Sequence, residues 1–236
     1  MNSQDFFNLE YLRLEAYRLL ADGYHRPEQN LLDGLAKLAT CMEQVCSEAE
    51  KYINYMLADI DRMDGPESVE IDYARLFVGP FNLLAPPYGS VYLESERRVM
   101  GASTADVQKR YQAAGLDVAT GFKDAPDHIA AELEFMHFLI FKAMEAANQG
   151  DVNGIVTCLL NQQSFLEVHL CAWIHDFAGH VIDNAKTSFY RNLARATEAF
   201  IKDDFHIISS VLPSWSSNPG KSADLELASV GIGVTH

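Results

Sequence analysis

The chain has 236 residues, and its 18 Lys and Arg against 33 Asp and Glu give a net charge of −15. This length is enough for one large domain with a hydrophobic core, and a hydrophobic content of 48% excludes a fibrous or disordered chain. Because nucleic acids are bound through clustered cations, the excess of acids argues against a nucleic-acid partner.

No stretch approaches the roughly 20 apolar residues that a membrane span requires, and the first residues lack the basic region of an export signal. We therefore expect a cytoplasmic protein with no membrane span. The four cysteines are spaced neither as a C-x-x-C pair nor as a zinc ribbon. We expect them to be reduced thiols, mostly in the core: Cys41, Cys46, Cys158 and Cys171.

Apolar residues recur at helical spacing along almost the whole chain, and no long segment alternates apolar and polar residues. This periodicity predicts an all-α fold. The first helix is predicted over about 5–22, with Gly23 as its C-terminal stop. Pro27 suits the first turn of a second, short helix, and Thr40 is the expected cap of a longer one that Gly65 ends.

The next predicted helix opens at Pro66 and ends at Gly79, because the proline that follows cannot continue the helical hydrogen bonds. Residues 79–92 then form a loop with three prolines and six large apolar side chains. Connecting loops are normally polar. The loop is therefore expected either to pack on the core as a lid or to form a binding surface.

In the second half, Ser103 followed by Asp106 resembles a capping box, and its helix is expected to end at Gly115. Residues 115–123 are a candidate hinge between the N- and C-terminal halves. A long helix is predicted to begin at 124–127 and to be stopped by Gly150.

A short helix is predicted near 152–161, and a second capping box, Ser164 with Glu167, is expected to open another. The last helix is predicted over 187–211. Pro213 and a run rich in Ser, Asn and Gly then predict loss of regular structure. We expect one all-helical domain of about eight to ten helices over residues 1–212 and a disordered tail over 213–236.

Glu134 and His137 form a Glu-x-x-His motif, which places a carboxylate and an imidazole on one helical face, as in di-iron bundles. Such a site needs a second copy, and the nearest, Asp203-x-x-His206, has the wrong acid. A solvated or hydrogen-bonded helix face is the expected role, and a helical-bundle di-iron carboxylate oxidase is the alternative. Motifs for phosphate binding and for serine or cysteine nucleophiles are absent, which favours a binding surface over a reaction centre.

Five blocks of sequence follow one another in a recognisable order: DYARLFVGP at 72–80, APPYGSVYL at 85–93, PDHIAAELEF at 126–135, FLEVHLCAW at 165–173 and FYRNLA at 189–194. Together they resemble the TorD/DmsD family of redox-enzyme maturation chaperones, and the resemblance covers about residues 10–211. It implies an all-helical, TorD-like fold, no catalysis and no cofactor of the protein's own.

The resemblance also implies a partner: the twin-arginine leader and catalytic subunit of a molybdoenzyme of the DMSO reductase type, held back from export until the molybdopterin cofactor is inserted. Family members occur as monomers and as swapped homodimers, and both states fit the candidate hinge. The family's leader-binding residues match here as Tyr73, Leu76, Phe77, Pro87, Tyr88, Asp127 and His128. The two tyrosines stand where relatives often have tryptophan, which keeps the aromatic character.

A twin-arginine leader carries two guanidinium groups followed by an apolar stretch. The apolar stretch is expected to lie in a groove walled by Leu76, Phe77, Pro87 and Tyr88. The carboxylates expected to bond the arginines are Asp127, Glu94, Glu96 and Glu134. His128 is expected to stabilise the helix entrance, to contact the leader backbone or to change charge near neutral pH.

Overall fold

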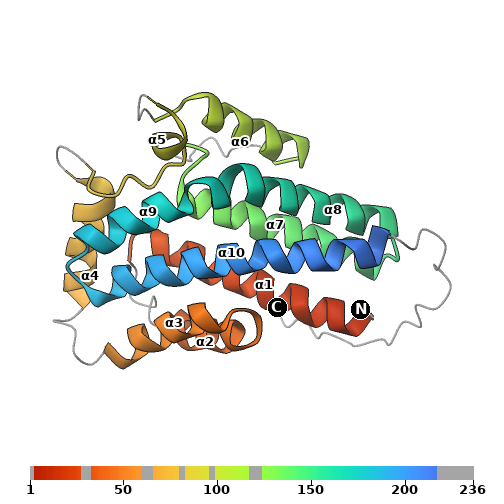
Figure 1. Cartoon of the computed structure of the whole chain (residues 1–236), viewed down its shortest axis with the longest axis horizontal. Coiled ribbons are helices and arrows are strands. Elements are labelled where there is room, and N and C mark those ends of the chain that lie inside the picture. The colour runs from red at the N-terminus through yellow and green to blue at the C-terminus, as the bar shows by residue number, and fades with distance from the viewer. Residues whose placement is uncertain are drawn as a thin grey trace, which may run out of the picture.

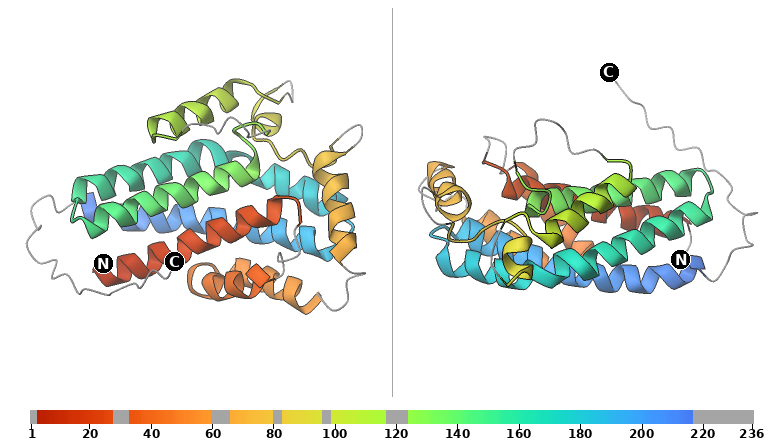
Figure 2. Two further views of the ribbon diagram at one scale, coloured as in Figure 1. Left: turned by 180° about the vertical axis from the view of Figure 1, so that it is seen from behind. Right: turned by 90° about the horizontal axis from the view of Figure 1, so that it is seen from above.

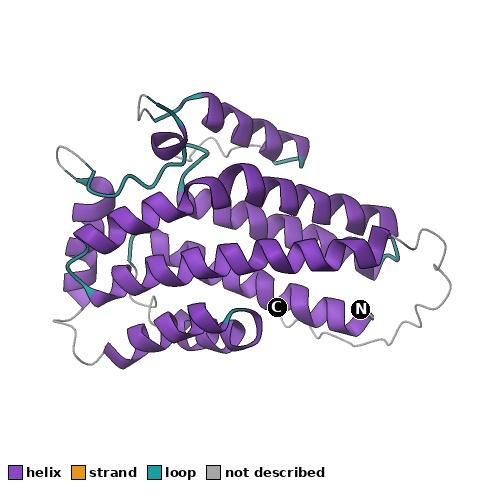
Figure 3. Cartoon of the chain, in the orientation of Figure 1, coloured by secondary structure: helices purple, strands orange, loops and turns teal. Residues whose placement is uncertain are grey.

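The computed structural model describes residues 3–27, 33–59, 66–79, 83–95, 99–116 and 124–216, and every regular element among them is helical (Figure 3). The prediction of an all-α fold is confirmed. The elements in chain order are α1 (Ser3–Tyr24), α2 (Asp33–Val45), α3 (Ser47–Asp59), α4 (Pro66–Tyr73), the π-helical turn η2 (Ala74–Val78), α5 (Ser90–Leu93), α6 (Ala102–Ala113), α7 (Ile129–Asn148), α8 (Val152–Phe165), the π-helical turn η3 (Leu166–Leu170), α9 (Cys171–Asn184) and α10 (Ser188–Ser216).

Long helices run side by side along the molecule (Figure 1). Helix α1 packs on α7, α7 packs on α8, and α10 packs on both α8 and α9. The pair α2 and α3 covers α1 and α10 on one side, α6 lies on the opposite side, and α4 crosses one end of the bundle (Figures 1 and 2). None of the described helices is long and apolar enough to cross a membrane.

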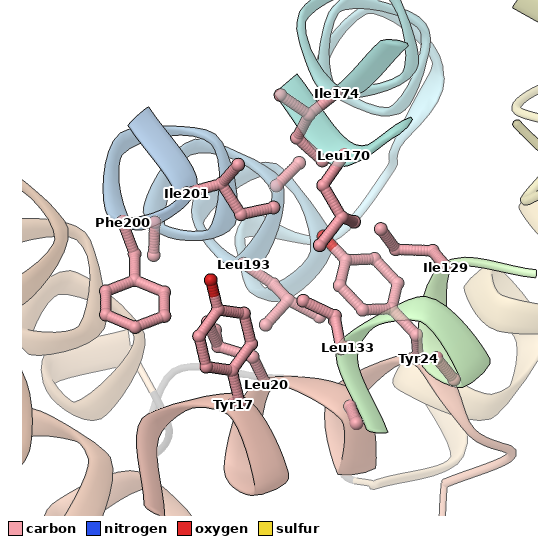
Figure 4. Close-up of a cluster of buried hydrophobic side chains, with 14 of the residues drawn as sticks. Tyr17, Leu20, Tyr24, Ile129, Leu133, Leu170, Ile174, Leu193, Phe200 and Ile201 are labelled. Carbon is pink, nitrogen blue, oxygen red and sulfur yellow. The ribbon is translucent and has the colours of Figure 1, made fainter. Parts of the chain in front are cut away.

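The core lies where α1, α7, η3, α9 and α10 face one another (Figure 4). Each helix contributes an apolar face to it, as the helical spacing of the sequence predicts. The side chains that converge there are fully or almost fully buried: Tyr17, Leu20, Tyr24, Ile129, Leu133, Leu170, Ile174, Leu193, Phe200 and Ile201.

A buried ionic network crosses this core. Arg13 of α1 is fully buried and donates to Asp204 of α10 at 2.5 and 3.0 Å, to Glu10 at 2.5 Å and to Gln162 of α8 at 2.8 Å. The Tyr17 hydroxyl donates to the same Asp204 carboxylate at 2.7 Å. These bonds tie three helices together, since a buried charge is tolerated only when it is paired and hydrogen-bonded.

Two predicted boundaries in the first half are wrong. Gly23 lies inside α1, which continues to Tyr24 because that side chain is 1% exposed in the core and its hydroxyl donates to Thr197 at 3.0 Å. Thr40 lies inside α2 and caps nothing, since its hydroxyl bonds back within the helix, and the break between α2 and α3 falls at Cys46. Pro27, the predicted start of the second helix, is followed directly by residues outside the described ranges, and the predicted stop at Gly65 lies outside them.

Neither predicted capping box forms. Helix α6 has Gly101 at its N-cap, and the Ser103 amide and hydroxyl both donate to Glu94, at 2.9 and 2.7 Å. Ser164 lies within the continuous helix α8–η3–α9, where its hydroxyl accepts from Arg110 at 3.0 Å. In both places a side-chain partner distant in sequence replaces the local bond that the motif predicts.

The last helix is longer than predicted, because α10 passes through Pro213 and ends at Ser216. The Trp215 ring packs edge-to-face on Phe6 of α1, with ring centroids 4.9 Å apart, and this contact supports the final turn. The predicted tail beyond Ser216 and hinge residues 117–123 lie outside the described residues.

Candidate functional site

Helix α4 is fixed to the turn between α9 and α10 by the buried carboxylate of Asp72. One oxygen accepts from the Lys186 amide at 2.9 Å and from the Thr187 amide and hydroxyl at 2.8 Å, and the other accepts from Arg75 at 2.8 Å. Arg75 also donates to the Asn184 carbonyl. The sequence signal for this anchor is the Asp-x-x-Arg spacing within a helix, and it does not predict the distant partners on the turn between α9 and α10.

The predicted groove walls Leu76 and Phe77 are 0% and 5% exposed, so they do not present a surface to a ligand in this conformation. The expectation that these two side chains wall a groove is not met in this conformation, because η2 turns both of them into the core. The Phe77 ring packs between Tyr24 and Phe177, at centroid distances of 6.1 Å from each. Tyr73 packs on Phe77, with ring centroids 5.4 Å apart. Tyr73 is half-buried, so its ring reaches the surface while the Phe77 ring does not.

The apolar loop packs on the core and pairs with the start of α7. The Pro87 carbonyl accepts from the Ile129 amide at 2.8 Å, and the Gly89 amide donates to the Asp127 carbonyl at 2.9 Å. Pro87 is buried, so it too is no groove wall, whereas Tyr88 between these bonds stays partly exposed. Over its described residues the loop is therefore a lid on the core that leaves the Tyr88 ring partly exposed.

Asp127 is 1% exposed and does not face a ligand, contrary to the expectation that it meets an arginine. One of its carboxylate oxygens accepts from the Ser90 amide at 2.7 Å and so holds the start of α5. Beneath this turn the Trp173 indole donates to Glu132 at 3.0 Å. A Cβ at Gly89 would lie 3.1 Å from the indole nitrogen, so the close approach of loop and indole favours glycine there.

His128 is the N-cap of α7, and its Nδ1 accepts from the Ala130 amide at 3.2 Å. The imidazole packs edge-to-face on the Tyr88 ring, with centroids 5.4 Å apart. Burial lowers the pKa of His128 to about 4, so the ring is neutral near pH 7. Of the three roles that the sequence left open, the structure shows the one at the helix entrance.

The other predicted acids differ in their surroundings. Glu94 accepts from Ser103 at the start of α6, which satisfies it locally, and Glu96 lies outside the described residues. Glu134 is 52% exposed and pairs with His25 at 2.8 Å. Asp124, which the sequence predicts only as part of a helix start, is exposed and accepts from the Tyr88 hydroxyl at 3.2 Å.

Five side chains thus gather on one surface, which we call the tyrosine–carboxylate surface: Tyr73, Tyr88, Asp124, Glu134 and His25. Burial and then the Asp124 carboxylate raise the pKa of Tyr73, and the same two causes raise that of Tyr88 to about 12. The hydrogen bond that His25 donates to Glu134 raises the pKa of His25, with a further contribution from the Asp124 carboxylate. Two phenolic rings edged by two carboxylates suit a ligand that is both cationic and apolar.

The metal alternative has no support in the geometry. Glu134 pairs with His25, whereas His137 bonds the Leu14 carbonyl at 3.0 Å through Nδ1, so the two side chains have separate partners. Over the described ranges no group of three or more His, Cys, Asp and Glu side chains could hold a metal ion. A di-iron centre needs ligands from several helices at one point.

The fold is that of redox-enzyme maturation proteins. A solved structure from Archaeoglobus fulgidus, assigned as a redox enzyme maturation protein, aligns with a TM-score of 0.50 and 21% identity over 80% of this chain and 93% of its own. A family model described as nitrate reductase delta subunit matches residues 34–179. The chain belongs to this family.

Curated relatives carry the name chaperone protein TorD. The protein from Vibrio cholerae is 28% identical over 192 residues, which cover 80% of this chain and 83% of the relative. The protein from Shewanella oneidensis is 26% identical over 164 residues, 67% of this chain and 69% of its own. The resemblance that the five sequence blocks carry is confirmed, and the chain is a member of a family of redox-enzyme maturation chaperones.

Proposed function

We propose that this protein is a cytoplasmic, non-catalytic chaperone that binds the twin-arginine leader of a molybdoenzyme catalytic subunit of the DMSO reductase type. It holds the precursor back from export until the molybdopterin cofactor is inserted. The tyrosine–carboxylate surface is the observation that carries the proposal, together with membership of the maturation family.

The chemistry of the surface matches a guanidinium group. Asp124 and Glu134 are exposed carboxylates, which bond arginine more strongly than a neutral acceptor does and can do so in a bidentate manner. Tyr73 and Tyr88 offer ring faces to the same cation or to the apolar stretch that follows it. The other five matched residues support this surface from beneath, because they are buried and hold its backbone and rings in place: Asp127, His128, Leu76, Phe77 and Pro87.

Binding is expected to be reversible. A flexible leader loses conformational entropy when it is ordered, so we expect a Kd on the order of micromolar. Replacement of both arginines by lysine removes bidentate bonding and is expected to weaken binding by about tenfold.

Titration calorimetry with synthetic leaders tests the proposal. The probes are a peptide with two adjacent arginines followed by an apolar stretch, and the same peptide with two lysines. Tyr88→Ala is expected to weaken binding of the arginine peptide by about tenfold, as aromatic anchors do, and Asp124→Asn by about two- to fivefold, as exposed ion pairs do.

Two variants serve as matched controls because they make the same substitutions on exposed residues elsewhere. Tyr55→Ala on α3 and Asp176→Asn on α9 are expected to leave the affinity unchanged. Equal affinity for the two peptides, or equal effects of site and control variants, would show that the surface does not recognise arginine.

A further inference from the structure

A cavity of about 250 Å³ lies between α1, α2 and the start of α10, beside the tyrosine–carboxylate surface. The buried side chains that line it are apolar, and the exposed side chains at its rim are polar. The interior side chains are Leu19, Leu35, Leu38, Phe189 and Leu193, and the rim side chains are Asp22, His25 and Arg26.

Two glycines keep this cavity open. A Cβ at Gly23 would lie 2.9 Å from the Leu193 side chain. At Gly34 a Cβ would meet only Leu19 within 4 Å, at 3.0 Å, so a larger side chain at this position extends into the cavity.

The size of the cavity restricts its occupant. A cavity of about 150 Å³ lined by apolar side chains holds a benzene molecule, whereas sites for drug-sized ligands and cofactors run from about 300 to 1,000 Å³. At about 250 Å³ the cavity fits one branched or aromatic side chain with space to spare, and it is too small for a nucleotide.

The rim joins the cavity to the tyrosine–carboxylate surface, because His25 lines the cavity and bonds Glu134 at 2.8 Å. The rim cation Arg26 is paired with Glu70 at 2.5 Å. The rim carboxylate of Asp22 is paired with Arg18 at 3.1 Å. A peptide that bonds Glu134 through an arginine therefore passes along a polar rim, whose charges are already paired, before it reaches the apolar side chains.

We propose that this cavity takes one large apolar side chain of the same leader, from the stretch that follows the arginines. This inference rests on the proposed function and adds a second, separate anchor to it. One polypeptide then occupies two neighbouring subsites, a cationic one on the surface and an apolar one in the cavity.

A double-mutant cycle in calorimetry tests the second anchor. The protein variant is Gly34→Leu, which fills the cavity, and the matched control is Gly179→Leu, because Gly179 on α9 has nothing within 4 Å of an added Cβ. The probes are the two-arginine peptide with leucines in its apolar stretch, the same peptide with serines there, and the two-lysine peptide.

With the unchanged protein, the serine peptide is expected to bind about tenfold more weakly than the leucine peptide, since a buried leucine side chain is lost. The Gly34→Leu variant is expected to bind the leucine peptide and the serine peptide equally, with the affinity that the unchanged protein has for the serine peptide. It is expected to keep its preference for the two-arginine peptide over the two-lysine peptide. Gly179→Leu should behave as the unchanged protein does. Circular dichroism and the urea midpoint verify folding, and Gly34→Ala, a smaller filling, replaces Gly34→Leu if that variant unfolds.

The outcomes separate the two proposals. If Gly34→Leu still binds the leucine peptide about tenfold more tightly than the serine peptide, the cavity is not the apolar subsite, whereas the proposal of arginine recognition is unaffected. If the unchanged protein does not distinguish arginine from lysine, the proposed function fails, whatever the cavity does.

Discussion

Individual polar side chains beside the tyrosine–carboxylate surface bond the backbone rather than a ligand. Asp72 accepts from the amides of Lys186 and Thr187, Asp127 accepts from Ser90, and His128 accepts from the start of α7. Buried polar groups need such partners, because an unpaired one is costly. Asp127 and His128, two of the side chains matched to leader binding, thus stabilise the folded chain without a ligand.

The His128 cap leads to a prediction about pH. Burial lowers the pKa of His128 to about 4, while Asp124, His25, Asp127 and Glu134 surround it. Since an exposed imidazole titrates near 6.5, the unfolded chain takes up a proton first as the pH falls. The folded state therefore loses up to about 3 kcal/mol of stability from this group between pH 6.5 and pH 4, and none above pH 7.

His128→Asn keeps an acceptor at the N-cap and removes this titration. We expect the variant to lose less stability than the unchanged protein between pH 7 and pH 4.5, as measured by urea unfolding at half-unit steps. If the stability of the two proteins falls in parallel with pH, His128 takes up its proton in the folded chain at the same pH as in the unfolded chain.

Among the elements, α4 with η2 decides which aromatic groups reach the surface. The π-helical turn Ala74–Val78 buries Leu76 and Phe77 and leaves Tyr73 half-exposed. It ends at Gly79, whose φ of 47° favours glycine. The attachment of α4 to the α9–α10 turn through Asp72 sets the position of this whole element.

Asp72→Ala is expected to loosen α4. The substitution removes the acceptor of two backbone amides, the Thr187 hydroxyl and Arg75, at a cost of about 2–4 kcal/mol. Urea unfolding measures the cost, and hydrogen exchange at Lys186 and Thr187 is expected to accelerate. Unchanged protection of both amides would show that the carboxylate does not hold this turn.

For the molecule as a whole, the network around Arg13 fixes how α1, α8 and α10 pack. Arg13→Met leaves the Glu10 and Asp204 carboxylates buried without their counter-charge, so we expect a loss of about 3–5 kcal/mol. Urea unfolding measures this loss. The control is Arg18→Met, which breaks the ion pairs of a 41% exposed arginine with Glu15 and Asp22 and is expected to cost at most about 1 kcal/mol.

Similar losses in the two arginine variants would mean that the buried network adds nothing beyond surface pairing. The contrast is informative because both arginines lie on α1 and pair with a Glu three residues earlier. They differ in burial, and burial is what makes an unpaired charge costly.

The amino-acid sequence alone determined the helical class, most of the helices and the family, because helical periodicity and ordered blocks of residues are properties of the chain itself. It failed where a distant contact replaces a local signal, as at Gly23, where Tyr24 is drawn into the core, and at Ser164, which bonds Arg110. A local pattern carries no information about such partners.

Only the tertiary structure decided which of the matched residues are exposed and which are buried. Tyr88 and Asp124 are 36 residues apart and His25 and Glu134 are 109 apart, yet each pair bonds at one surface, while Asp127 is sealed beneath it. Exposure depends on which helix covers a side chain, and that is settled by packing between segments far apart in the chain rather than by neighbours in sequence.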